Sequence, residues 1–267
     1  MRKENGLKTI WSIFFLFIVL FVANFFIKTN IDITSTMWLI LALCITILAI
    51  IMLVKNKLPR KEQILLSFLF GSLMFVAYQG ITFSSIESFL VTFLSSMASF
   101  SIFNKYESKA ILLLNDKSII TMLISIFIGI VIGIIWGILN LFLSNGELHL
   151  KITYSCFTLA LSPAIFEEIS YRAFLYAACL HYLKGEIATK LEQFTCWFMM
   201  IIPHVMIHTP GIFVSDGIVS GIISILILSF VFGLPFAILQ RKRDLVSAMI
   251  AHGVVMIIRF CFLGAPF

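Results

Sequence analysis

Nine long apolar runs divide this chain, and their length constrains the fold more than any other feature. A helix needs about 20 consecutive apolar residues to cross the hydrocarbon core of a bilayer, and most of the runs come close to that length. Of the 267 residues, 61% are hydrophobic and only 12% are charged, whereas about a quarter are charged in an ordinary soluble domain. The sequence therefore predicts an all-α polytopic membrane protein with eight to nine transmembrane helices. The runs cover residues 10–27, 37–54, 63–83, 88–103, 118–143, 152–182, 194–209, 217–239 and 245–263.

Basic residues collect in alternate links between these runs. The N-terminus and the links after the second, fourth, sixth and eighth runs are rich in Lys and Arg, whereas the other links carry few. Because cytoplasmic loops of membrane proteins carry the basic excess, this alternation predicts an integral membrane protein with a cytoplasmic N-terminus. The general style of the chain favours the plasma membrane of a bacterium. The net charge of +6 belongs to the loops and forms no basic stripe, so nucleic acid is excluded as a partner.

The cysteines predict free buried thiols rather than a metal site or a disulfide framework. None belongs to a CxxC pair, and all lie in or beside apolar runs, where free cysteine behaves as a small hydrophobic residue. The five are Cys44, Cys156, Cys179, Cys196 and Cys261.

Three glycines recur at four-residue spacing in the fifth run. Gly129, Gly133 and Gly137 would form a ridge of small residues on one helix face, against which a second helix can pack closely. No strand precedes them, so a glycine-rich ligand loop is disfavoured.

Ionisable side chains inside the runs are confined to the later part of the chain. Each costs several kcal/mol in a bilayer on most scales, so each one needs a partner, a cavity or a function. Polar chemistry is therefore expected in the last three-fifths of the protein. The residues concerned are Glu167, Glu168, Arg172, His204, His208, His252 and Arg259.

Two adjacent glutamates stand close to an arginine in the sixth run. On an α-helix Glu168 and Arg172 are four residues apart and can pair. Glu167 then points about 100° away, free to face a cavity. A carboxylate in such a low-dielectric place suits a general base. The alternative is a salt bridge at the membrane interface, with Glu167 in contact with water.

Three histidines occur in later runs. His204 and His208 are four residues apart, so they share one face of a helix, at a spacing that metal ligands use. The glutamate of an HExxH metalloprotease motif is missing between them. The alternative is a pair of histidines hydrogen-bonded to neighbouring helices. With His252 on a further helix and Glu167 available, the set favours a built site.

The ordered motifs resemble the CAAX protease and bacteriocin-processing (CPBP) family of intramembrane proteases, also called the ABI family. Glu167, Glu168 and Arg172 fit its E-E-x-x-x-R motif, His208 with Pro210 fits the end of its second motif, and His252 fits its third. The segment 232–245 also resembles the family. The resemblance covers about residues 115–263, which implies two regions: an N-terminal four-helix membrane region, 1–112, and a protease core, 113–267.

The resemblance implies an intramembrane endopeptidase that hydrolyses a peptide bond in a membrane-associated or secreted peptide precursor. The partners would be a peptide or lipidated peptide and the bilayer. Glu167, with His208, would activate a water molecule, and His252, with His204, would stabilise the oxyanion. Glu168 and Arg172 would fix the helix and orient Glu167.

A divalent metal such as zinc is a further expectation from the resemblance. The family has been interpreted both as glutamate proteases and as metalloproteases. The additional histidine in this chain suggests His204, His208 and His252 as the ligands.

Two positions depart from the family pattern. His204 stands where the second motif usually has Phe, and Met256 stands where the third usually has Asn or Asp. An oxyanion donor typically contributes about two to three orders of magnitude in rate. The chain is thus an impaired enzyme, an enzyme that uses His204 instead, or a non-catalytic membrane partner or bacteriocin-immunity protein of the same fold. A proton-coupled transporter is disfavoured, because the sequence has no duplicated halves.

Overall fold

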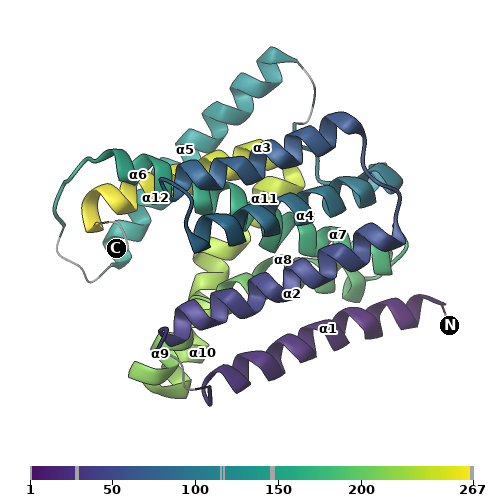
Figure 1. Ribbon diagram of the computed structural model, residues 1–267, viewed down its shortest axis with the longest axis horizontal. Coiled ribbons are helices and arrows are strands. Elements are labelled where there is room, and N and C mark those ends of the chain that lie inside the picture. Colours follow the sequence, from purple (N-terminus) through teal and green to yellow (C-terminus); the bar gives the residue numbers. More distant parts are fainter. Residues whose placement is uncertain (1, 28–29, 115, 117, 145–147, 265–267) are drawn as a thin grey trace. The chain divides into compact units, whose positions relative to one another are not determined.

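The computed structural model describes residues 2–27, 30–114, 116, 118–144 and 148–264, and in these ranges every element is a helix (Figure 1). The elements are α1 (Arg2–Asn24), α2 (Ile33–Lys55), α3 (Lys61–Ala77), α4 (Phe83–Lys105), η1 (Glu107–Lys109), α5 (Ile119–Leu143), α6 (Tyr154–Leu159), η2 (Ser162–Ala173), α7 (Phe174–Tyr182), α8 (Lys190–Met206), α9 (Pro210–Ser215), α10 (Gly217–Leu228), η3 (Ser229–Gly233), α11 (Leu234–Lys242) and α12 (Leu245–Leu263).

Six helical segments within the described ranges are long and apolar enough to cross a membrane. Together they identify an integral membrane protein. Of the other three predicted runs, α3 and α8 each have 17 residues, and the run 152–182 is divided among α6, η2 and α7. The count of eight to nine spans therefore stays a prediction, with six supported by length and composition. The six are Asn5–Asn24, Ile33–Lys55, Phe83–Lys105, Ile119–Leu143, Gly217–Lys242 and Leu245–Leu263.

The run 152–182 differs from the uninterrupted α-helix that its apolar composition suggested. Its central part, η2, is a π-helix, in which hydrogen bonds join residues five apart, and which is frequent at functional sites. Arg172 is five residues from Glu167 and four from Glu168. The α-helical geometry behind the predicted pairing of Glu168 with Arg172 is therefore wrong for this segment, while the pair itself stays a prediction.

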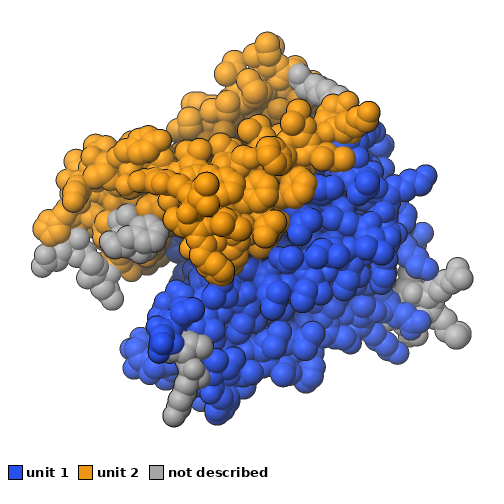
Figure 2. All heavy atoms as spheres, in the orientation of Figure 1, with its two compact units in different colours: residues 1–60, 94–110, 170–235 blue, residues 61–93, 111–169, 236–267 orange. Residues whose placement is uncertain are grey.

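The chain forms two compact units, which Figure 2 shows in different colours. Unit 1 consists of residues 1–60, 94–110 and 170–235, and unit 2 of residues 61–93, 111–169 and 236–267. Each unit contains residues from both predicted regions, 1–112 and 113–267. The division of the chain at residue 112 therefore stays a prediction.

In unit 2, helices α5 and α12 lie against each other along the glycine ridge. A Cβ atom added at Gly133 would lie 2.6 Å from the Cβ of Val254 and 2.7 Å from the carbonyl oxygen of Ala251. A Cβ at Gly137 would lie 2.6 Å from Cδ1 of Ile258. Only glycine permits such an approach, which confirms the close helix packing predicted from the four-residue spacing.

The start of α12 is fixed by a buried carboxylate. Asp244 accepts a hydrogen bond from the backbone N–H of Ser247 at 2.9 Å, as an N-cap does. Its other oxygen accepts from the hydroxyl of Ser125 in α5 at 2.6 Å, and Nε of Arg243 lies 3.6 Å away. These contacts fix where α12 begins against α5, and therefore fix the position of His252 along α5.

In unit 1, the N-terminal helices contact the helices that follow η2. The indole N–H of Trp11 in α1 donates to the hydroxyl of Thr195 in α8 at 3.2 Å, and Phe21 packs edge-on against Phe213 of α9. The backbone N–H of Gly211 lies 3.3 Å from the Thr34 hydroxyl oxygen of α2, its acceptor. Helices α1 and α2 thus support the chain around the predicted second motif.

Candidate functional site

Glu168 of unit 2 is bonded through both of its carboxylate oxygens. Its side chain is completely buried. Oε1 lies 2.7 Å from Nδ1 of His252, and Oε2 accepts from Nε2 of Gln240 at 2.7 Å. The same Gln240 nitrogen donates to the backbone carbonyl of Glu168 at 2.9 Å. Because a carboxylate can only accept, Nδ1 of His252 is the donor in this pair.

His252 is held between this carboxylate and an aromatic ring. The ring of Phe236 stacks on the imidazole with centroids 4.7 Å apart and an interplanar angle of 14°. With Nδ1 directed at Glu168, Nε2 lies 3.8 Å from Oε2 of Glu167. That separation is too long for a direct hydrogen bond.

Glu167 and His252 differ from Glu168 in their exposure. They are 8% and 7% exposed, whereas Glu168 is fully enclosed. Unit 2 therefore brings together three of the predicted site residues, Glu167, Glu168 and His252. One carboxylate acts on His252 from the buried side, and the other faces its second nitrogen.

Two residues of this cluster were not singled out from the sequence. Gln240 stands at the start of the basic stretch before Asp244, which is typical of a solvated loop, and Phe236 was one apolar residue among many. Both lie in the segment 232–245 that resembles the family, and this resemblance was the available signal. The structure places them in α11, against η2 and α12 respectively.

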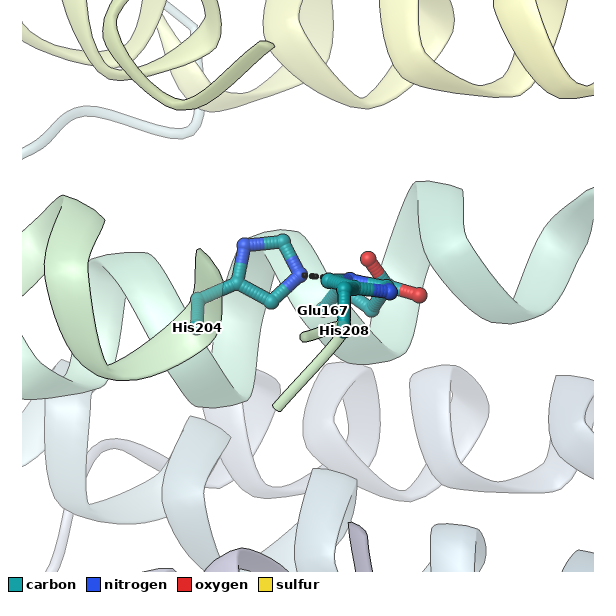
Figure 3. A group of neighbouring side chains, drawn as sticks. All are labelled: Glu167, His204 and His208. Atoms are coloured by element: carbon teal, nitrogen blue, oxygen red, sulfur yellow. Dashed lines mark hydrogen bonds between the residues drawn. The ribbon is translucent and has the colours of Figure 1, made fainter. Parts of the chain in front are cut away.

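Unit 1 contains the other two histidines. The Nε2 atoms of His204 and His208 lie 3.4 Å apart, as Figure 3 shows with a dashed line. Helix α8 ends at Met206, and the backbone N–H of His208 bonds the carbonyl of Val205 at 3.1 Å in a tight turn. The two rings meet as predicted, but through this turn and not along one helix face. Figure 3 also draws Glu167, which belongs to unit 2.

Aromatic rings surround this histidine pair. Trp38 of α2 meets His208 edge-on, with centroids 5.0 Å apart. Tyr171 lies 5.8 Å from His204 and 5.6 Å from Trp38. His204 is buried and His208 is exposed. Trp38 was missed from the sequence because it lies in the N-terminal region outside the family resemblance, where a lone aromatic in an apolar run carries no signal.

The spacing of the two imidazole nitrogens also fits a zinc site. Two ligands at about 2.0–2.1 Å from a tetrahedral zinc are about 3.3 Å apart, close to the 3.4 Å between Nε2 of His204 and Nε2 of His208. The pair can therefore supply two ligands. The predicted third ligand, His252, belongs to unit 2, and the set of three stays a prediction.

Met256, the departure from the third motif, lies in α12 beyond His252. Its side chain packs against an apolar cluster of unit 2 that includes Cys156, Leu159 and Phe260. An amide at this position would meet apolar partners in this structure. The residue thus serves packing here.

Comparison with known proteins places these residues in a family. Residues 149–258 match the family model described as type II CAAX prenyl endopeptidase Rce1-like. No curated protein and no solved structure matches the chain. The matched segment contains all the predicted site residues as well as Gln240 and Phe236. Residues 149–258 therefore match the Rce1-like family of CAAX proteases, the kind of family that the motifs predicted.

Proposed function

We propose that this protein is an intramembrane endopeptidase that hydrolyses a peptide bond in a membrane-associated or secreted peptide precursor. The match of residues 149–258 to a protease family supports the reaction class. The observation that carries the mechanism is the arrangement in unit 2, where His252 contacts buried Glu168 through Nδ1 and faces Glu167 through Nε2.

In the proposed mechanism Glu167 is the general base. It removes a proton from a water molecule while the water oxygen attacks the scissile carbonyl carbon. His252 donates from Nε2 to the developing oxyanion, because Glu168 stabilises the imidazolium through Nδ1 and fixes the ring. The proton held by Glu167 then passes to the leaving amine, which completes hydrolysis without a covalent intermediate.

The histidine pair of unit 1 receives its proposed roles from the family resemblance. His208 assists the activation of water, and His204 replaces the donor that Met256 does not supply. His204 and His208 would also hold a zinc ion, because their nitrogen spacing fits one. When bound, zinc would polarise a water molecule or a carbonyl group. Arg172 helps to fix the helical segment that carries both glutamates.

The proposed substrates follow from the membrane setting and from the family. Six described segments can span a bilayer, and the matched family acts on CAAX prenyl proteins by its printed description. A peptide that is itself anchored, by an apolar segment or by a lipid, would reach groups placed at membrane depth. The proposed location is the plasma membrane of a bacterium, with the N-terminus in the cytoplasm.

The test is cleavage in proteoliposomes that contain the full chain. Quenched-fluorescent peptide libraries are added in unmodified, acylated and farnesylated forms, and products are identified by mass spectrometry. We expect cleavage by the wild-type protein and by the Glu62→Gln control at an exposed glutamate, and its loss in Glu167→Gln. Equal cleavage by Glu167→Gln at equal protein level would contradict the mechanism, and no cleavage of any library by any variant would contradict the activity.

A further inference from the structure

Four of the five cysteines form two close pairs. The side chains of Cys156 and Cys261 are near enough to interact in unit 2, and those of Cys179 and Cys196 are near enough to interact in unit 1. All five thiols are free, and these four are buried, as the sequence predicted. The two pairs thus offer an internal comparison, because they stand in different surroundings.

The backbone of Lys151 contacts both cysteines of the first pair. The carbonyl oxygen of Lys151 accepts a hydrogen bond from Sγ of Cys156 at 3.6 Å. Its N–H donates to the carbonyl oxygen of Cys261 at 2.7 Å. Both cysteines also belong to one buried apolar cluster, with Leu159 and Phe260. The segment therefore fastens the beginning of α6 to the end of α12 and keeps the two sulfurs adjacent.

The two pairs differ in their access to small molecules. Cys156 lines an open cavity of about 650 Å³ in unit 2, together with polar side chains that include Gln79, Thr153 and Ser155. Cys179 borders a cavity of only about 10 Å³ with almost wholly apolar walls. A void of that size is at the limit of what one water molecule needs. A small reagent can thus reach Cys156 but has no room beside Cys179.

We propose that Cys156 and Cys261 are a reactive dithiol that oxidises to an intramolecular disulfide joining α6 to α12, with a low-molecular-weight disulfide as the oxidant. The Cys156 thiolate attacks one sulfur of the oxidant, which forms a mixed disulfide and releases the first thiolate. The Cys261 thiol then loses its proton and attacks the Cys156 sulfur, which releases the second. Two electrons pass to the oxidant, which leaves as two thiols.

The position of the disulfide bond suggests that it affects catalysis. This expected effect on catalysis rests on the proposed function. Helix α6 leads into η2, which carries Glu167 and Glu168, and α12 carries His252. The disulfide would therefore join α12, which holds His252, to the short helix that leads directly into η2. Its formation is expected to change the cleavage rate, and a reductant to restore the original rate.

The experiment uses the wild-type full chain in detergent micelles. The protein is treated with 2,2′-dithiodipyridine, remaining thiols are blocked, and tryptic peptides are mapped by mass spectrometry. We expect the Cys156–Cys261 link to form at least about tenfold faster than any Cys179–Cys196 link, because reactivity follows access. Equal rates for the two pairs, or an unlinked Cys156–Cys261 pair at saturating oxidant, would overturn the proposal.

Two matched variants separate an intramolecular bond from other products. One keeps only Cys156 and Cys261, and the other keeps only Cys179 and Cys196, with the remaining cysteines replaced by Ser. After oxidation we expect the first to lose both free thiols as a monomer, and the second to keep both. Crosslinked dimers of the first variant would count against the proposal. The thiol readout needs no substrate, so an inactive protein would contradict the proposed function and leave this result intact.

Discussion

The histidines of the two units are held in opposite ways. In unit 2, His252 has a carboxylate on Nδ1 and a stacked phenyl ring. In unit 1, His204 and His208 face each other across 3.4 Å and are bordered by Trp38 and Tyr171. A hydrogen bond to a buried carboxylate fixes both the ring and its proton, whereas aromatic edges fix only the position of a ring. The first environment suits a proton donor, and the second suits a ligand pair.

The largest expected effect tests which carboxylate of unit 2 is the base. Glu167→Gln keeps the shape of the side chain and removes the proton acceptor. We expect cleavage to fall by about 10²–10⁴-fold, the range typical of general-base loss, while the amount of protein in the membrane is unchanged. Cleavage is measured in proteoliposomes, and the amount of protein is measured by quantitative immunoblotting. A parallel fall in protein level would mean that Glu167 stabilises the fold and is not the base.

The next prediction concerns zinc in unit 1. If the nitrogens of His204 and His208 are ligands, protein purified without chelator should hold about one zinc per chain, by elemental analysis. His208→Ala should lose most of it, while Trp38→Phe, which leaves both nitrogens in place, should retain it. Zinc-free wild-type protein with full cleavage activity would exclude the metal, and the pair would then act through hydrogen bonds alone.

A smaller effect is expected from Glu168→Gln, which leaves one acceptor oxygen for two donors, Nδ1 of His252 and Nε2 of Gln240. One of these donors then faces the new amide N–H group in a buried place, at a cost of about 1–3 kcal/mol. We expect a lower unfolding temperature in detergent and slower cleavage. Removing the second donor as well, in Glu168→Gln with Gln240→Leu, should cost less than the sum of the two single changes. Strict additivity would mean that the two side chains do not interact.

The smallest effect is predicted for Trp38, whose ring borders His208. An edge-on aromatic contact contributes about 0.5–1.5 kcal/mol beyond burial, so Trp38→Leu should slow cleavage several-fold. Trp38→Phe retains a ring and should stay close to wild type. The change should appear in kcat with KM unaltered, because the contact positions a histidine and touches no substrate. A change confined to KM would place Trp38 in the binding surface instead.

The sequence predicted the composition of the unit 2 cluster better than its geometry. Intramembrane charges are costly, so Glu167, Glu168 and His252 stood out from an apolar background. The glycine ridge of α5 was readable for a similar reason, because its spacing is regular. Both features depend on residue type and local periodicity, and these are the quantities that a sequence states directly.

The contact partners of these residues could not be predicted from the sequence. Whether residues 162–173 form an α-helix or a π-helix changes which side chains align, and the residue types are compatible with both. Gln240 contacts Glu168 across 72 positions of sequence, and Trp38 reaches His208 from a region without any family motif. Such contacts are products of tertiary packing, and neither composition nor periodicity encodes them.

A peptide embedded in lipid can reach a buried group only where two neighbouring helices separate. Along α5 and α12 the glycines bring one backbone against the side chains of Val254 and Ile258, with less space than a methyl group needs. Separating these helices would replace tight van der Waals contact by lipid along most of their length. We therefore expect this seam to stay closed, and in the proposed function a substrate would enter on another side of α12.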